Sequence, residues 1–167
     1  MNWDNKDEVL FEVSENADSF LTVSDRLQDD KDVALEAVKG NGEVLEFASD
    51  RLRDDRDVVL EAVKDYGNAL QFASNRLQDD FDIVLEAVKN DGMALQFASD
   101  RLKSDKKVVL EAVKNNGRAF RWAFKIIKRD YDVVLQAVKN YPRALDYAGE
   151  EILEKYPTVK ILLNSEK

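Results

Sequence analysis

Pairs of adjacent aspartates are the first residues of this chain whose types suggest chemistry, because neighbouring carboxylates can bind cations or share a proton. The pairs are Asp29 and Asp30, Asp54 and Asp55, and Asp79 and Asp80. None has the glycine and terminal glutamate of a calcium loop. The second aspartate of each pair stands just before an apolar run, where its side chain can cap the first turn of a helix. We therefore expect the pairs to be structural, with no metal site.

The sequence offers no pattern typical of a catalytic nucleophile. Serines recur at Ser24, Ser49, Ser74 and Ser99, but no base accompanies them, and no glycine-rich phosphate loop occurs. The chain has no histidine and no cysteine, which removes the commonest general base, the commonest metal ligand and any thiolate. We expect a protein that is not an enzyme and that needs no cofactor.

Two further columns of residues suggest binding. Arginines recur at Arg26, Arg51, Arg76 and Arg101, each followed by leucine. Such a ladder can bind phosphates or carboxylates, but acidic residues within four positions of each arginine favour internal pairing. Aromatic residues recur at Phe47, Phe72, Phe97, Trp122 and Tyr147. Such a column more often fills the space between packed units than forms a binding strip.

One segment departs from this regularity. Residues 118–130 read RAFRWAFKIIKRD, whereas the counterparts at 68–80 and 93–105 read NALQFASNRLQDD and MALQFASDRLKSD. Phe124 replaces a serine and is an added apolar group. From Arg101 to Arg129 there are ten basic and two acidic residues, a net charge of +8, so the rest of the chain carries −17 and the whole −9. Such asymmetry is typical of a protein with a charged partner.

Wrapped as an α-helix at ~100° per residue, the basic residues of this segment fall within about 100° of arc. They are Arg118, Arg121, Lys125, Lys128 and Arg129. Trp122 and Phe124 flank this basic stripe. A basic stripe edged by aromatic residues suits an acidic protein surface, or the phosphates and bases of a nucleic acid. A merely solvated face is an open alternative, and so is self-association between the basic and acidic parts of two copies.

A 25-residue repeat must position all these residues. Its copies occupy residues 7–31, 32–56, 57–81, 82–106, 107–131 and 132–156. Each copy predicts two short helices: a first one ended by a left-handed glycine, as at Gly67, and a second one with Leu70 and Leu77 on its apolar face. We expect residues 157–167 to form a C-terminal capping helix and Trp3 to cover the other end.

Helix pairs this short bury their apolar faces only by stacking on one another. The sequence thus predicts an all-α fold, an α-solenoid of six two-helix repeats in a single domain over residues 1–167. The motif VVLEAVKxxGxALQFASDRLxxD resembles the tandem helical repeat known as domain of unknown function 4116 (DUF4116), over nearly the whole chain. That resemblance implies a helical repeat fold used for binding, and it implies no catalytic residues. The repeat is also similar in length to leucine-rich-repeat-variant solenoids, which implies a right-handed superhelix.

These observations predict a protein-interaction module, an inhibitor or adaptor, that binds a protein partner through the basic stripe. Nucleic acid on the same stripe is one alternative, disfavoured by the net charge of −9. The other is that the acidic surface engages a basic partner as a phosphate mimic. No apolar run reaches the ~20 residues of a membrane-spanning helix. The N-terminal residues MNWDNKDEVL do not resemble a secretory signal, so we expect a cytoplasmic location and no membrane contact.

Overall fold

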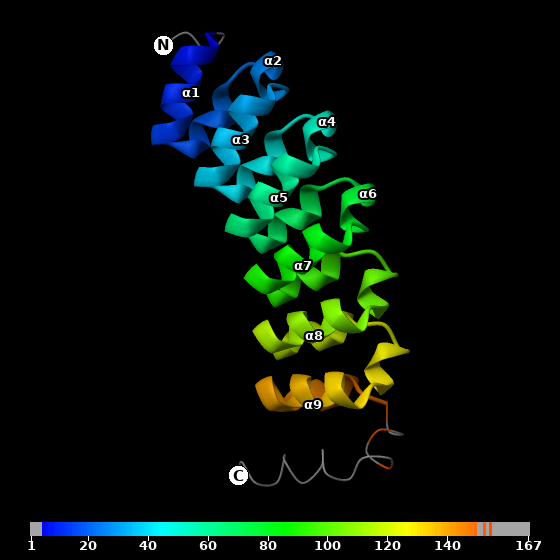
Figure 1. The fold of residues 1–167 in the computed structure, drawn as a ribbon. Coiled ribbons are helices and arrows are strands. Elements are labelled where there is room, and N and C mark those ends of the chain that lie inside the picture. The colour runs from blue at the N-terminus through cyan, green and yellow to red at the C-terminus, as the bar shows by residue number, and fades with distance from the viewer. Residues whose placement is uncertain (1–4, 150–151, 153, 155–167) are drawn as a thin grey trace.

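The computed structural model describes residues 5–149, Ile152 and Glu154, which form a gently bent stack of helices (Figure 1). No strand occurs in this part of the chain. The 25-residue period is confirmed, because ten-residue α-helices begin at Lys6 and at every 25th residue after it. These helices are α1 Lys6–Glu15, α3 Lys31–Gly40, α5 Arg56–Asp65, α7 Phe81–Asn90, α8 Lys106–Asn115 and α9 Tyr131–Asn140. The predicted caps, Trp3 and residues 157–167, lie outside the described residues.

The predicted single second helix is wrong. Within the described residues, the rest of the repeat consists of two short helical segments. The first is a six-residue 3₁₀ helix: η1 Ala17–Thr22, η2 Gly42–Phe47, η3 Gly67–Phe72, η4 Gly92–Phe97, η6 Gly117–Trp122 and η8 Pro142–Tyr147. A shorter turn follows: α2 Asp25–Gln28, α4 Asp50–Arg53, α6 Asn75–Gln78, η5 Leu102–Ser104 and η7 Ile127–Arg129. Extended backbone separates the two, as at Ala73, where φ is −68° and ψ is 153°.

Hydrogen bonds between repeats explain this break. The N–H of Ser74 donates to the carbonyl oxygen of Arg53 in the preceding repeat at 2.9 Å, and the N–H of Ser99 donates to that of Gln78 at 2.9 Å. A continuous α-helix would use the same N–H groups for bonds within itself. An N–H group donates one such hydrogen bond, so the bond from Ser74 to the neighbouring repeat takes the place of the bond that would continue the second helix.

The predicted aspartate caps are confirmed. Asp55 Oδ1 accepts hydrogen bonds from the N–H groups of Asp57 at 3.0 Å and Val58 at 3.3 Å. The same arrangement begins the other long helices after α1, at Asp30, Asp80, Asp105 and Asp130. Each carboxylate also lies at the positive end of the helix dipole. The caps tie neighbouring repeats together as well, since Lys31 Nζ lies 2.9 Å from Asp55 Oδ2.

The glycines after the long helices serve a different purpose from the one predicted. No glycine in the described residues has a positive φ, so the left-handed conformation is wrong. A Cβ placed on Gly67 would instead lie 2.5 Å from the carbonyl oxygen of Ala87 in the next repeat. The N–H of Gly67 donates to Asn90 Oδ1 at 2.8 Å. Glycine therefore lets the backbone of one repeat lie directly on the next, as it also does at Gly42, Gly92 and Gly117.

The core is continuous along the stack. The long helices pack side by side in chain order, and the 3₁₀ helices form a second row that packs against them. In the α5 repeat the fully buried side chains include Val59, Val63, Leu70 and Leu77. At ~1.5–3 kcal/mol for each large apolar side chain, burial against neighbours stabilises every repeat. No helix in the described part of the chain has both the length and the hydrophobicity to cross a bilayer.

Candidate functional site

An aspartate, a serine and an arginine join neighbouring repeats along the edge formed by the short turns, and we call each such set a polar rung. In one polar rung, Asp54 Oδ1 accepts hydrogen bonds from the hydroxyl of Ser74 and, at 3.0 Å, from Arg76 Nε. Arg76 Nη2 also donates to the Asp54 carbonyl oxygen at 2.6 Å. The two other polar rungs are Asp29 with Ser49 and Arg51, and Asp79 with Ser99 and Arg101. Internal pairing is confirmed for Arg51, Arg76 and Arg101, but the partner carboxylate lies 22 residues earlier, in the preceding repeat, and not within four positions as predicted.

The polar rungs hold their carboxylates in the ionised state. A hydrogen bond from the Ser74 hydroxyl, followed by one from Arg76, lowers the pKa of Asp54. The same causes lower the pKa of Asp29 and of Asp79. Carboxylates bonded in this way already have cationic partners, which suits a structural role. Among the described residues, no group of acidic side chains is placed to hold a metal ion.

One polar rung is replaced as a whole. Ser104, Phe124 and Ile126 occupy the positions that hold aspartate, serine and arginine in the polar rungs. The backbone is unchanged, because the N–H of Phe124 still donates to the carbonyl oxygen of Lys103 at 3.0 Å. The side chains of Phe124 and Ile126 are 41% and 68% exposed. The replacement thus leaves two apolar groups in solvent at the positions where the three polar rungs make an ion pair.

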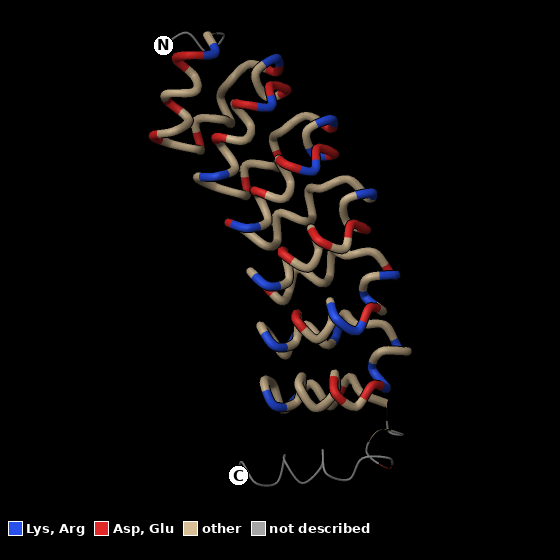
Figure 2. Tube along the Cα trace, in the orientation of Figure 1, with Lys and Arg blue, Asp and Glu red and all other residues tan. Residues whose placement is uncertain are grey.

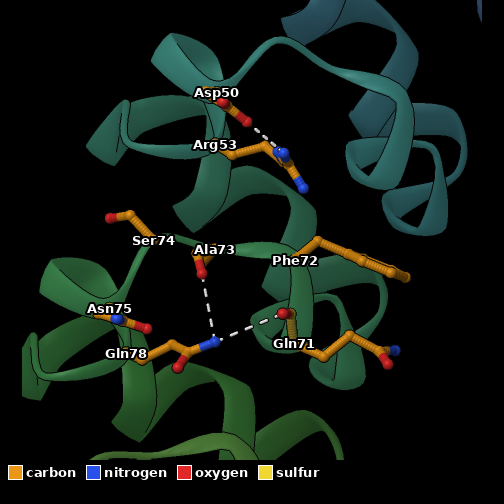
Figure 3. Close-up of a pocket in the computed structure, with 8 residues that line it drawn as sticks. All are labelled: Asp50, Arg53, Gln71, Phe72, Ala73, Ser74, Asn75 and Gln78. Atoms are coloured by element: carbon orange, nitrogen blue, oxygen red, sulfur yellow. Dashed lines mark hydrogen bonds and ion pairs between the residues drawn. The ribbon is translucent and has the colours of Figure 1, made fainter.

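The regular version of this edge is a shallow hollow between α4 and the following repeat (Figure 3). Its lining residues are Asp50, Arg53, Gln71, Phe72, Ala73, Ser74, Asn75 and Gln78. Most polar groups here are satisfied internally: Gln78 Nε2 donates to the carbonyl oxygens of Leu70 at 3.1 Å and Ala73 at 3.2 Å, and Arg53 bonds to Asp50. These hydrogen bonds occupy several of the polar groups of the hollow, although Arg53 Nε is buried without a partner.

Two repeats further along, the equivalent positions carry a different set of side chains. They are Asp100, Lys103, Arg121, Trp122, Ala123, Phe124, Lys125 and Lys128. Four of these are cationic, whereas the hollow in Figure 3 has one arginine. In Figure 2 red and blue alternate along the upper part of this edge, and blue predominates beside α8. We call Arg121, Trp122, Phe124, Lys125 and Ile126 the basic edge.

The structure separates the residues of the predicted stripe. Arg118 and Arg121 are exposed on η6, with their guanidinium carbons 5.2 Å from the ring centre of Tyr141 and 4.9 Å from that of Trp122. Lys125 is exposed beyond the extended break, and Arg129 is exposed at the end of η7. Trp122 is half-buried and packs against the core.

Lys128 does not point outward. Its Nζ donates to the Arg121 carbonyl oxygen at 2.8 Å and lies 5.7 Å from the ring centre of Phe120. Partial burial lowers the pKa of Lys128. Lys128 therefore makes the same kind of internal hydrogen bond that Gln78 makes to the Gln71 carbonyl oxygen. It is a positioning residue of the basic edge and not a contact residue.

A single helical stripe is accordingly wrong for residues 118–129. The segment consists of η6, extended backbone at Ala123 with φ −64° and ψ 145°, and η7. Arg118 and Arg121 share one face because 3₁₀ residues three apart align. Ile126 was missed by the prediction as a site residue. Its signal was present in the sequence, since it takes the position of an arginine that four other repeats keep.

The repeat matches one known protein family. The family model for a domain of unknown function, DUF4116, matches five overlapping stretches of the chain. These are residues 8–53, 30–78, 55–103, 80–128 and 105–153. No curated protein and no solved structure matches the chain at a significant level.

Proposed function

The chain belongs to the DUF4116 family, and on that premise we propose that it is a non-enzymatic protein-interaction module, an adaptor or inhibitor, that binds its partner through the basic edge. The module is an α-solenoid of six repeats in one domain, with the basic edge at the junction after α8. The observation that carries the proposal is the joint replacement of a polar rung by Ser104, Phe124 and Ile126. A cytoplasmic location stays a prediction from the sequence.

The chemistry of the basic edge selects an acidic protein segment that carries an apolar anchor. Phe124 and Ile126 supply apolar area that solvation alone disfavours, and such side chains are the usual anchors of protein interfaces. Arg121 and Lys125 flank them and are exposed. Exposed cations beside a desolvated anchor favour carboxylates and speed encounter with an acidic partner. Trp122, which packs against the core, and Lys128, which bonds to the Arg121 carbonyl oxygen, support the basic edge from inside.

The carboxylates of the polar rungs are weak candidates for binding a basic partner. The carboxylates of Asp29, Asp54 and Asp79 already accept bonds from a serine and an arginine. A basic partner would have to displace those internal bonds. This argues against phosphate mimicry by the polar rungs.

The decisive variant restores the polar rung with S104D, F124S and I126R together. These residues occupy the same positions in other repeats, and the changes leave the net charge unaltered. We expect the native protein to enrich displayed peptides that combine Asp or Glu with Phe, Leu or Trp. The restored variant should bind those peptides at least about tenfold more weakly, as expected when two anchors are lost.

A matched control makes the opposite change elsewhere. D54S, S74F and R76I together remove a polar rung two repeats away and should leave peptide binding intact. Equal enrichment by the native and rung-restored proteins would disprove the basic edge as the site. Enrichment of single-stranded oligonucleotides in place of peptides, with binding that weakens steeply with salt, would overturn the proposal in favour of nucleic acid.

A further inference from the structure

The row of 3₁₀ helices forms a second surface, which shares Arg121 with the basic edge. Successive members pack against each other, from η1 with η2 through η6 with η8. The second and fifth residues of each 3₁₀ helix are exposed or half-exposed on one side, because residues three apart align in this type of helix. In chain order the pairs are Asp18 and Leu21, Glu43 and Glu46, Asn68 and Gln71, Met93 and Gln96, Arg118 and Arg121, and Arg143 and Asp146. We call these twelve residues the graded row.

Charge changes sign along the graded row. The pairs on η1 and η2 carry −1 and −2, those on η3 and η4 are neutral, and those on η6 and η8 carry +2 and 0. Within the described residues, Glu43, Glu46, Arg118 and Arg121 make no ion pair. The regular charged positions of the long helices and the polar rungs do, as in Lys31 with Asp55. Glu43 and Glu46, and the guanidinium groups of Arg118 and Arg121 that lie over the rings of Tyr141 and Trp122, are therefore available for an ion pair with another molecule.

The acidic end also has a suitable shape. A hollow between η1 and η2 is lined by Asp18, Leu21, Asn41, Glu43, Val44, Glu46 and Phe47. Leu21 and Phe47 expose 42% and 40% of their surfaces beside the carboxylates. An arginine fits such a site, because its stem packs on apolar groups while its guanidinium bonds to carboxylates. At the basic end, Arg118 and Arg121 are such arginines.

The two ends match when a second copy runs antiparallel. A two-fold axis between η3 and η4 places η2 against η6 and η3 against η4 of the other copy. Glu43 and Glu46 then face Arg118 and Arg121, twice in the pair, and the neutral side chains meet at the centre. A parallel arrangement would set like charges opposite each other, which is repulsive. We propose that two copies of this chain associate antiparallel through the graded row, with the acidic hollow of each receiving the arginines of the other.

The size of the graded row sets the strength of this association. Five intervals of ~9 Å and a width of ~10 Å give roughly 450 Å² per copy, below the ~800 Å² of a standard interface. The dimer is therefore weak and reversible, and its dissociation constant rises with ionic strength because its main contacts are exposed charges.

Two variants test the pairing directly by sedimentation velocity at low salt. E43R with E46R makes both ends basic, and R118E with R121E makes both ends acidic. Each variant alone should lose self-association by at least about tenfold, since four attractive charge pairs become repulsive. A mixture of the two should form a heterodimer about as tight as the native dimer, because every charge again faces its opposite.

The outcomes are distinct from those for the basic edge. E43R with E46R should leave binding of acidic peptides unchanged, and the rung-restored variant should still dimerise. A native protein that stays monomeric at low salt up to the highest soluble concentration would overturn the dimer, as would a mixture that fails to pair while both variants keep native circular dichroism. Either failure leaves the peptide result standing.

Discussion

At the scale of single residues, Gly67 occupies a position that leaves no room for a side chain. Its backbone touches the next repeat, and an added Cβ would lie 2.5 Å from the Ala87 carbonyl oxygen and 2.9 Å from the Asp91 nitrogen. Backbone atoms cannot move aside as the end of a flexible side chain can. The constraint therefore comes from contact between repeats and not from an unusual φ.

G67A should accordingly destabilise the protein by about 2 kcal/mol or more, the cost typical of overpacking against a rigid neighbour. The free energy of unfolding from urea titration measures this change. G149A is the matched control, because nothing lies within 4 Å of a Cβ at that position. Its effect should stay within about 0.5 kcal/mol. Equal effects of the two substitutions would refute a contact-based role for Gly67.

Residue types alone predicted some of these roles and not others. The caps at Asp55 and Asp80 were predictable, because capping depends on local position and residue type. The role of Gly67 was not predictable. A left-handed turn and a close contact between repeats both require glycine, and both would place it at the same 25-residue spacing. Lys128 was likewise misplaced, because its inward direction depends on a carbonyl oxygen seven residues away.

At the scale of the elements, each repeat is joined to the next by a polar rung and by a cap. Partial burial alone would raise the pKa of Asp55, but hydrogen bonds from Lys31 and from the N–H of Val58 outweigh it and lower the pKa. In the polar rungs the serine and arginine lower the pKa of the aspartate. The junctions therefore favour ionised carboxylates in the folded state.

The sign of the pH dependence follows from those lowered pKa values. Their stabilisation is present above the unfolded pKa of about 3.9 and is lost as the pH falls through the lower folded values. We expect a nearly constant denaturation midpoint from neutral pH down to about 5, and a decline below about 4. D29N, D54N and D79N together should flatten that decline, whereas D100N, outside the polar rungs, should not. If the denaturation midpoint of the triple variant declines below about pH 4 as it does in the native protein, the polar rungs do not cause that decline.

The broken second half of the repeat shows where sequence prediction failed at this scale. Apolar spacing around Leu70 and Leu77 fits one helix, and the stack does bury both. The break at Ala73 depends on the bond from Ser74 to Arg53 of the neighbouring repeat. Hydrophobic periodicity does not reveal a hydrogen-bond partner 21 residues away in the chain. The predicted basic stripe therefore assumed a continuous helix that does not form.

At the scale of the whole molecule, the stack is a series of nearly equivalent junctions. Each long helix contacts the next one in chain order, and equivalent positions of these helices are buried in successive repeats. Repeat proteins of this kind gain stability from nearest-neighbour contacts. A whole repeat is therefore removable if the register is kept.

Deleting residues 57–81 should preserve the fold. Asp55 would then cap the helix at Asp82 and Ile83, and Gly42 would lie on Ala87 in place of Ala62. We expect native helical content per residue and an unfolding m-value lower by roughly one sixth, in proportion to the surface buried. Deleting residues 57–80 leaves one extra residue at the new junction and shifts its register by one, so this variant should be less stable and unfold less cooperatively. Similar behaviour of the two deletions in circular dichroism would contradict the equivalence of the junctions.

The two ends of the stack depart from this equivalence at the position of the contact glycine. Ala17 stands there in η1, opposite Gly40, and Pro142 stands there in η8. Proline has no N–H with which to repeat the bond from Gly117 to Asn140. A gene duplication that copied residues 132–156 would bury that proline inside the array and break the chain of backbone contacts. Duplications of 32–56 through 107–131 carry glycine at this position, so an added interior copy of 25 residues can repeat the backbone contact.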